Sequence, residues 1–202
     1  QDTYAHYILN YQSQIRLMIK MQFQIGVARR ICETIGTLNM PSVSEKLGQM
    51  AAQAAMVEGL VYGMESGGGY YNGYYVPDRN LMYTAQVLTQ QLYPEFITSM
   101  REIAGGGLIM LPSSVKDFEN PEIARYIHAT QNSAVGTSEE KVKFMKLAWD
   151  AIGSEFASRH TQYEMFYAGA QFVTRGHALR TYDWNRSKIL VDDILNSYNL
   201  ED

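Results

Sequence analysis

The sequence predicts an all-α protein, an antiparallel bundle of helices, and three observations lead to it. Apolar residues recur every three or four positions over long stretches, as they do on one face of a helix. Sustained alternation of period two, which marks a half-buried strand, is absent, and so is any repeat of roughly 20 to 50 residues. Proline and glycine gather between the periodic stretches, where they end helices. Long helices with short connections are typical of a bundle.

Composition bounds the size and the class of the protein. With 202 residues and 46% hydrophobic content, we expect residues 1–202 to form a single domain with a sizeable core, two domains being the weaker alternative. The chain begins without an initiator methionine and soon enters a helical pattern. We therefore expect a helical domain taken from a longer polypeptide, or a processed product.

The charge balance and the single cysteine exclude several functions. The formal net charge is −4 without blocks of one sign, so neither nucleic acid nor a membrane is an expected partner. The stretch 50–64 is too polar to span a bilayer. Cys32 is the one cysteine, which rules out an internal disulfide or thiolate cluster and favours a cytoplasmic protein.

The first two helices are predicted at about 3–38 and 43–64. The first is free of proline, and its roughly 35 residues would span about 50 Å, enough to pack against another domain or subunit. Pro41 separates the two, and Ser42 and Glu45 have capping-box spacing. Alanine and glycine on the second helix favour close packing inside a bundle.

A loop rich in glycine and tyrosine follows at 65–78. It shows no secondary-structure period, and a surface or interface loop is favoured over a phosphate cradle because no strand precedes it. Asp78 can cap a third helix at about 79–103, which Pro94 would kink or split. The apolar stretch 105–114 is interpreted as a buried crossing.

Two further caps open the last helices. Asn120 and Pro121 begin a short helix to about residue 129. Thr137 and Glu140 form a capping box that opens a fourth long helix, about 138–167. Short helices after 171 are expected at about 172–182 and 185–196.

The fourth long helix looks ligand-facing. Gly153, Ser154 and Ser158 have small side chains and lie beside the apolar face, so a flat molecule or another backbone could come close to the helix there. That face is predicted to consist of Val142, Met145, Trp149, Ile152, Phe156, Tyr163 and Phe166.

Catalytic signals within the chain are weak. His160 and Glu164 share a helix surface and could act as an acid and a base, but a surface or interface ion pair is favoured. His6, His128 and His177 receive no role. Nucleophile elbows and the Glu-x-x-His pattern of di-iron bundles are absent, so we expect no catalytic residue and no metal site in this chain.

Three segments carry a family resemblance. Residues 105–114 (GGGLIMLPSS), 146–160 (KLAWDAIGSEFASRH) and 163–169 (YEMFYAG) resemble the C-terminal region of 4-hydroxyphenylacetate 3-monooxygenase oxygenase components, which are two-component FADH2-dependent aromatic hydroxylases. The resemblance implies an acyl-CoA dehydrogenase-like architecture in which this chain is the C-terminal bundle. It also implies a homotetramer, a separate NAD(P)H-dependent flavin reductase that supplies reduced FAD, and ortho-hydroxylation of a 4-substituted phenol such as 4-hydroxyphenylacetate with O2.

The resemblance also suggests which residues contact the cofactor. It places Gly153, Ser154, Glu155, Phe156 and Arg159 beside FAD, with Ser113 and Ser114 as further candidates. Side-chain donors from Ser154 and Arg159 are the expected contacts, because main-chain N–H groups at 153–154 are free only if the helix ends or is irregular there. The catalytic residues are expected on parts outside this chain, so the isolated domain should be inactive.

Three alternatives stay open. The chain could be a helical assembly module that makes no cofactor contact, or the oxygenase could act on another phenol. The family also has a branch that dehydrates 4-hydroxybutyryl-CoA with an iron-sulfur cluster, and that branch fits poorly because Cys32 has Ile25, not a histidine, seven residues before it.

Overall fold

The computed structural model describes residues 5–198 and confirms the all-α helical bundle. Its helices are α1 (Ala5–Ile35), α2 (Pro41–Ser66), α3 (Arg79–Ala104), α4 (Pro121–Thr130), α5 (Ser138–Ile152), α6 (Glu155–Phe166), α7 (Gln171–Thr181) and α8 (Trp184–Asn196). Two 3-10 turns, η1 (Gly105–Leu108) and η2 (Val115–Glu119), and a hairpin of β1 (Gly69–Tyr71) and β2 (Tyr74–Val76) connect them. None of the described helices is long and apolar enough to cross a membrane.

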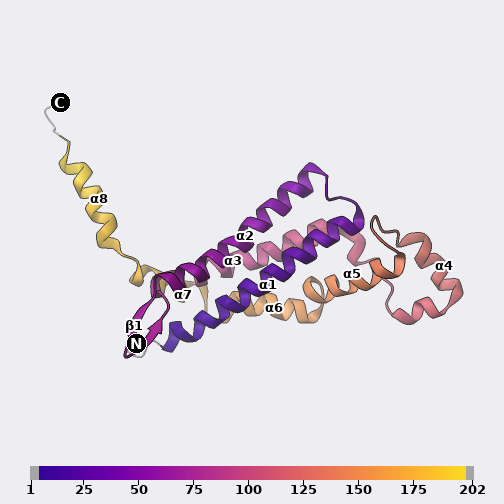
Figure 1. Cartoon of the computed structure of the whole chain (residues 1–202), viewed down its shortest axis with the longest axis horizontal. Helices are drawn as coiled ribbons and strands as arrows, with labels where there is room; N and C mark the ends of the chain where they lie inside the picture. Colours follow the sequence, from indigo (N-terminus) through magenta and orange to yellow (C-terminus); the bar gives the residue numbers. More distant parts are fainter. Residues whose placement is uncertain (1–4, 199–202) are drawn as a thin grey trace.

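The long helices α1, α2 and α3 run alongside one another, and α5 and α6 follow the same body (Figure 1). The hairpin lies at one end of this body and α4 at the other, while α8 projects away from it (Figure 1). Helix α3 is central, because it contacts α1, α2, α6 and α7.

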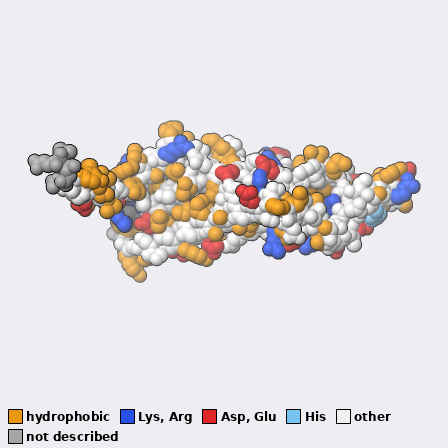
Figure 2. Space-filling model, turned by 90° about the horizontal axis from the view of Figure 1, so that it is seen from above, with side chains coloured by type: hydrophobic (Ala, Val, Ile, Leu, Met, Phe, Trp, Pro, Cys, Tyr) orange, Lys and Arg blue, Asp and Glu red, His pale blue; other side chains and the backbone are white. Residues whose placement is uncertain are grey.

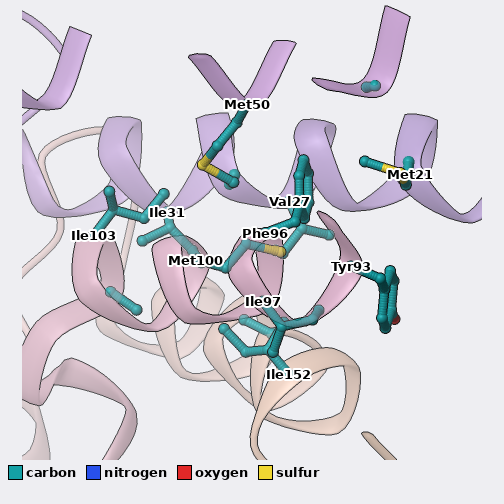
Figure 3. Packing of buried hydrophobic residues seen from close by; sticks show 14 of the residues in the cluster. Met21, Val27, Ile31, Met50, Tyr93, Phe96, Ile97, Met100, Ile103 and Ile152 are labelled. Atoms are coloured by element: carbon teal, nitrogen blue, oxygen red, sulfur yellow. The ribbon is translucent and has the colours of Figure 1, made fainter. Parts of the chain in front are cut away.

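The main core fills the space where α1, α2, α3 and α5 meet (Figure 3). It is formed by side chains that recur at helical spacing and exclude water, among them Met21 and Ile31 of α1, Met50 of α2, Phe96 and Met100 of α3, and Ile152 of α5. Methionine suits such a core because its unbranched side chain fills irregular gaps.

Several helix starts follow the predicted caps. The Asp78 carboxylate accepts a hydrogen bond from the Leu81 N–H at 2.7 Å, and Asn120 caps α4 with Pro121 in the first turn. Thr137 and Glu140 form the expected reciprocal capping box. The box at Ser42 is wrong, because α2 begins at Pro41, two residues before the predicted start at 43, and its N-cap residue Met40 makes no side-chain cap. Proline itself suits the first helical position, where its missing N–H costs nothing.

Helix α3 runs unbroken through Pro94, so the split that was one of the two outcomes expected there is wrong; neighbours such as Phe96 are packed in the core and outweigh the local cost. Two other expectations about the middle of the chain are also wrong. The loop at 65–78 contains the β1–β2 hairpin, turned by Asn72 and Gly73 with φ of 47° and 82°, a signal the sequence carried. The stretch after η1 is not buried, because the Ile109 side chain is 81% exposed.

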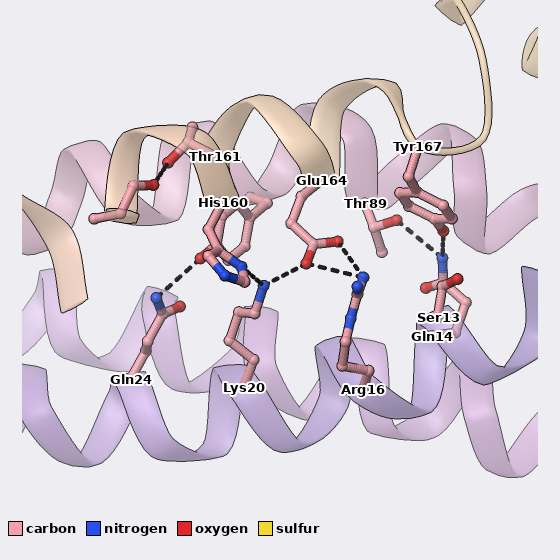
Figure 4. Close-up of polar contacts among 12 residues, drawn as sticks. Ser13, Gln14, Arg16, Lys20, Gln24, Thr89, His160, Thr161, Glu164 and Tyr167 are labelled. Carbon is pink, nitrogen blue, oxygen red and sulfur yellow. Dashed lines mark hydrogen bonds and ion pairs between the residues drawn. The ribbon is translucent and has the colours of Figure 1, made fainter. Parts of the chain in front are cut away.

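A polar seam joins α6 to α1 across the face of α3 (Figure 4). The Glu164 carboxylate, 1% exposed, accepts hydrogen bonds from Arg16 Nη2 at 3.0 and 3.1 Å and from Lys20 Nζ at 2.5 Å. Lys20 Nζ also lies 3.0 Å from His160 Nδ1. Burial lowers the pKa of Lys20, although Glu164 opposes that shift. The seam is therefore an ion cluster in which one buried carboxylate lies between two partly exposed cations.

Helix α7 is fixed to α3 by different contacts. The His177 ring stacks on the Tyr83 ring at a centroid distance of 4.7 Å, with His6 of α1 beside both. The buried Thr174 hydroxyl donates a hydrogen bond to Gln90 Oε1 at 2.8 Å. No local pattern predicts these pairs, because the α3 partners lie 84 residues from Thr174 and 94 residues from His177 along the chain.

We predict that Glu164→Gln lowers the free energy of unfolding by about 3 kcal/mol, because it leaves Arg16 and Lys20 facing a neutral amide. Chemical denaturation measures the change. Glu155→Gln is a matched control, since Glu155 also pairs with a cation of its own but is 81% exposed; it should change stability by less than about 0.5 kcal/mol. Equal effects of the two variants would contradict a buried cluster.

We also predict that stability falls as the pH drops through the histidine range. Burial lowers the pKa of His160 and of His177 in the folded state, helped by the neighbouring Lys20 and Arg180 charges respectively. Below an ordinary histidine pKa of about 6.5, the unfolded chain therefore binds more protons than the folded chain, and the free energy of unfolding decreases.

Urea titrations at a series of pH values test this dependence. The variants His160→Gln and His177→Gln should each flatten the curve between neutral pH and the lowered pKa, because glutamine does not titrate. Curves that keep the wild-type slope in both variants would assign the pH dependence to other groups.

Candidate functional site

The candidate site is the junction between α5 and α6. The predicted single helix at 138–167 is wrong, because α5 ends at Ile152 and α6 begins at Glu155. At the junction the N–H groups of Gly153 and Ser154 both donate to the Trp149 carbonyl, at 2.7 and 2.9 Å. Ser154 then takes an extended conformation, with ψ of 171°. The helix therefore ends where the small residues stand, and a second helix starts there.

Ser154 and Arg101 hold this junction in shape. Ser154 Oγ accepts a hydrogen bond from the Ala157 N–H at 3.1 Å and donates one to the Asp150 carbonyl at 2.9 Å. From α3, Arg101 Nε donates to the Ile152 carbonyl at 2.9 Å, which satisfies an acceptor at the end of α5. The Ser154 hydroxyl is thus engaged by the backbone, contrary to the expectation that it points to a ligand.

Gly153 is needed because of the neighbouring indole. A Cβ built on Gly153 would lie 2.5 Å from Trp149 Cε3, well inside van der Waals contact. Its φ of −120° is open to any residue, so the requirement comes from the close approach of the ring. The Trp149 side chain, 41% exposed, therefore covers the junction and presents its other side to solvent.

The first turn of α6 offers hydrogen-bond donors to the outside. The N–H groups of Glu155 and Phe156 precede the first intrahelical bonds, and neither makes another backbone hydrogen bond within residues 5–198. They lie at the positive end of the α6 dipole. Arg159 Nη2 lies 2.8 Å from Glu155 Oε1, both exposed, and the Phe156 ring lies 4.3 Å from the ring of His160.

The break also changes which side chains face out. Ser154 resets the helical phase, so that Ala157 and Glu164 are the buried residues of α6. Three members of the predicted apolar face that follow the break, Phe156, Tyr163 and Phe166, are exposed instead, and Trp149 of α5 is also exposed although it precedes the break. Val142, Met145 and Ile152, which precede the break, are buried as predicted. The result is an exposed aromatic flank on both sides of the junction.

Ser113 and Ser114 lie elsewhere on the same side of α5. Ser114 caps η2, and the Asp117 carboxylate accepts hydrogen bonds from the Ser114 N–H at 3.0 Å and from Ser113 Oγ at 3.3 Å. Lys146 Nζ donates to the Ser113 carbonyl at 3.1 Å. Lys146 is seven residues before Gly153, so the contact between Lys146 and Ser113 lies roughly 10 Å along α5 from the junction. The structure unites the five residues at 153–159 and leaves the two serines apart from them.

The expectation of a surface pair at His160 and Glu164 is corrected by the polar seam. Glu164 is buried and shared between Arg16 and Lys20, so its carboxylate is not free to exchange protons with a ligand at the junction. Sequence reasoning missed Arg16, Lys20 and Arg101, because their partners are between 51 and 148 residues away. No local pattern encodes such pairs.

Comparisons with known proteins show which family this chain belongs to. The sequence model of the family described as 4-hydroxyphenylacetate 3-hydroxylase C terminal matches residues 1–196. The 4-hydroxyphenylacetate 3-monooxygenase oxygenase component of Pseudomonas aeruginosa is 33% identical over 171 residues, which are 84% of this chain and 33% of that protein. The chain spans about a third of the length of the curated relatives it matches.

Solved structures agree on the fold. One similar structure is the oxygenase component of 4-hydroxyphenylacetate 3-monooxygenase complexed with FAD and 4-hydroxyphenylacetate, with a TM-score of 0.87 and 26% identity over 93% of this chain and 39% of that one. A 4-hydroxybutyryl-CoA dehydratase from N. maritimus has a TM-score of 0.83 at 19% identity, over 96% of this chain and 40% of that one, which shows a shared fold alone. The match over residues 1–196 and the close relative show that this chain belongs to the 4-hydroxyphenylacetate 3-hydroxylase C-terminal family.

Proposed function

We propose that this chain is the C-terminal helical domain of a flavin-dependent monooxygenase that hydroxylates a 4-substituted phenol, such as 4-hydroxyphenylacetate, ortho to its hydroxyl group. The observation that carries the proposal is membership of the family, together with a similar structure that holds FAD and 4-hydroxyphenylacetate. Reduced FAD would supply the electrons with which O2 is activated. The role of this chain is to position the cofactor and to build subunit contacts.

The junction residues fit one edge of a flavin. The free N–H groups of Glu155 and Phe156 can donate to acceptor atoms of the cofactor, and the α6 dipole favours negative charge there. The exposed rings of Trp149 and Phe156 offer apolar walls for a flat ring system. Arg159 adds a guanidinium that can leave Glu155 for an anionic ligand group.

Gly153 and Ser154 would act through the shape of the junction. Gly153 lets the Trp149 indole lie close to the backbone, and the Ser154 hydroxyl caps α6 so that its first N–H groups stay free. Ser113 and Ser114 are proposed as more distant contacts, because FAD is long enough to extend along α5 past Lys146. Catalytic groups for the phenol are assigned to parts of the oxygenase outside this chain.

The proposal includes partners and a compartment. A separate NAD(P)H-dependent flavin reductase would deliver reduced FAD, the oxygenase would assemble as a homotetramer, and the protein would work in the cytoplasm. Another phenol could replace 4-hydroxyphenylacetate without change to this domain. A dehydratase role is disfavoured, since Cys32 is fully buried in the apolar core and is not placed to hold a cluster.

A second function is an assembly module without cofactor contact. The observation that favours it is the number of large apolar side chains left exposed on α1, α6, α7 and α8. Under this alternative the junction would serve packing between subunits, and its substitution would change association without changing FAD affinity.

Activity of the whole oxygenase tests the first proposal. We expect the full-length protein with FAD, a flavin reductase, NADH and O2 to convert a 4-substituted phenol to a catechol, detected by chromatography. The 202-residue chain alone should form none, because the catalytic groups are outside it. Catechol formation by the isolated chain would overturn this division of roles.

A substitution at the junction separates the two functions. We expect Arg159→Gln in the full-length oxygenase to weaken FAD binding about tenfold, because a charge-assisted hydrogen bond is lost, as measured by fluorescence titration. Arg175→Gln on α7, whose guanidinium contacts Gln171, is the matched control and should keep the wild-type affinity. Unchanged FAD affinity with altered association in Arg159→Gln would favour the assembly module.

A further inference from the structure

Lys20 is a largely buried cation. Figure 2 shows Lys, Arg, Asp and Glu side chains standing at the surface among apolar and neutral ones, where water and salt screen their charges. The Lys20 side chain is 17% exposed, and its Nζ atom lies between the Glu164 carboxylate and the His160 imidazole (Figure 4). Burial lowers the pKa of Lys20, and the ion pair with Glu164 works against that shift. Lys20 is therefore an ammonium group held against a histidine ring.

The contact with Lys20 fixes which nitrogen of His160 carries the ring proton. Lys20 Nζ lies 3.0 Å from His160 Nδ1. An ammonium group can only donate hydrogen bonds, so Nδ1 accepts, and a neutral imidazole then has its hydrogen on Nε2. A proton on Nδ1 would bring two donors face to face at this distance. The imidazole is consequently neutral as long as it stays against Lys20.

The other groups around His160 leave this constraint in place. Burial lowers the pKa of His160, and the charges of Lys20 and Arg16 on α1 lower it further. Glu164 of α6 favours the imidazolium form, but its carboxylate oxygens already accept from Arg16 and Lys20. From α3, the Tyr93 ring centroid lies 5.2 Å from Lys20 Nζ, and its phenol stays neutral because burial raises its pKa to about 12. The surroundings therefore favour an uncharged His160.

His160 also packs against a residue of the α5–α6 junction. It follows Phe156 by one turn of α6, and the centroids of the two rings are 4.3 Å apart. The Phe156 side chain is 66% exposed, so the imidazole supplies part of the limited packing that holds this ring. The half-buried His160 ring thus touches the ion cluster on one side and Phe156 on the other. A movement of the imidazole away from Lys20 would change the surface on which Phe156 rests.

We propose that His160 is a positioning residue of the α5–α6 junction, because Lys20 holds its imidazole in the neutral Nε2–H form and the imidazole in turn holds the Phe156 ring in place. The inference rests on the proposed function, in which Phe156 is one wall of the FAD site. When His160 gains a proton at low pH, its ring has to leave Lys20, since the two cations repel each other. Phe156 then loses its support, and the junction binds FAD less tightly.

A fluorine label on Phe156 tests this coupling without FAD. In the full-length oxygenase with 4-fluorophenylalanine at position 156, we expect the 19F shift to change as the pH falls below about 6.5. Lys20→Met removes the nearest opposing charge and should raise the midpoint by about one pH unit. Arg16→Met is the matched control, because Arg16 also bonds Glu164 but does not contact His160; its midpoint should move less. Circular dichroism shows whether each variant keeps the helical bundle.

Fluorescence titration with oxidised FAD is the second readout. The affinity of the unlabelled oxygenase should fall at least about threefold over the same pH range, the effect of losing one aromatic contact, and should not depend on pH in His160→Phe. A wild-type 19F shift that ignores pH, or equal midpoints in Lys20→Met and Arg16→Met, would overturn the inference. If the 19F shift behaves as expected while FAD affinity stays constant, the positioning of Phe156 holds and the FAD contact of the proposed function fails instead.

Discussion

The position of α6 depends on one buried carboxylate. Ala157 and Glu164 are the buried residues of this helix, and His160, Thr161 and Met165 are half-buried, so that a large share of its buried surface is polar. Glu164 is fixed between Arg16 and Lys20 of α1. Burial of the Glu164 carboxylate is costly unless ion pairs of good geometry compensate for the lost hydration. The ion cluster thus decides the rotation and the height of α6 along the bundle.

That placement determines what the α5–α6 junction can present. With Glu164 turned inward, Phe156 and Tyr163 turn outward, and the first turn of α6 opens to solvent. From the other side, Arg101 of α3 holds the last carbonyl of α5. The junction is therefore defined by contacts with two helices, while its own residues, Gly153 and Ser154, permit the break. A rigid frame of this kind suits a surface that positions a cofactor.

The two halves of the bundle both have apolar clusters, but they differ in how many polar side chains they bury. The half around Phe96 and Ile152 is an apolar core of methionine, isoleucine and aromatic side chains. The half around Gln14, Gln90 and Thr174 buries amides and hydroxyls, which need partners in fixed geometry. Apolar packing stabilises the bundle, and the buried hydrogen bonds of the other half set how α1, α3, α6 and α7 are aligned with one another.

The sequence by itself determined the helical class, most helix boundaries and the caps at Asp78, Asn120 and Thr137, because these depend on residues within a few positions of one another. It also marked Gly153 and Ser154 as unusual and carried the family resemblance. The hairpin at Asn72 and Gly73 was predictable but was missed. The break between α5 and α6 had local signals, Gly153 at the end of α5 and Ser154 as the N-cap of α6. Tertiary structure alone decided that Glu164 is buried and that the aromatic flank is exposed. Those outcomes rest on Arg16, Lys20 and Arg101, which are distant in sequence, and an ion pair between distant residues forms only once the fold has brought them together.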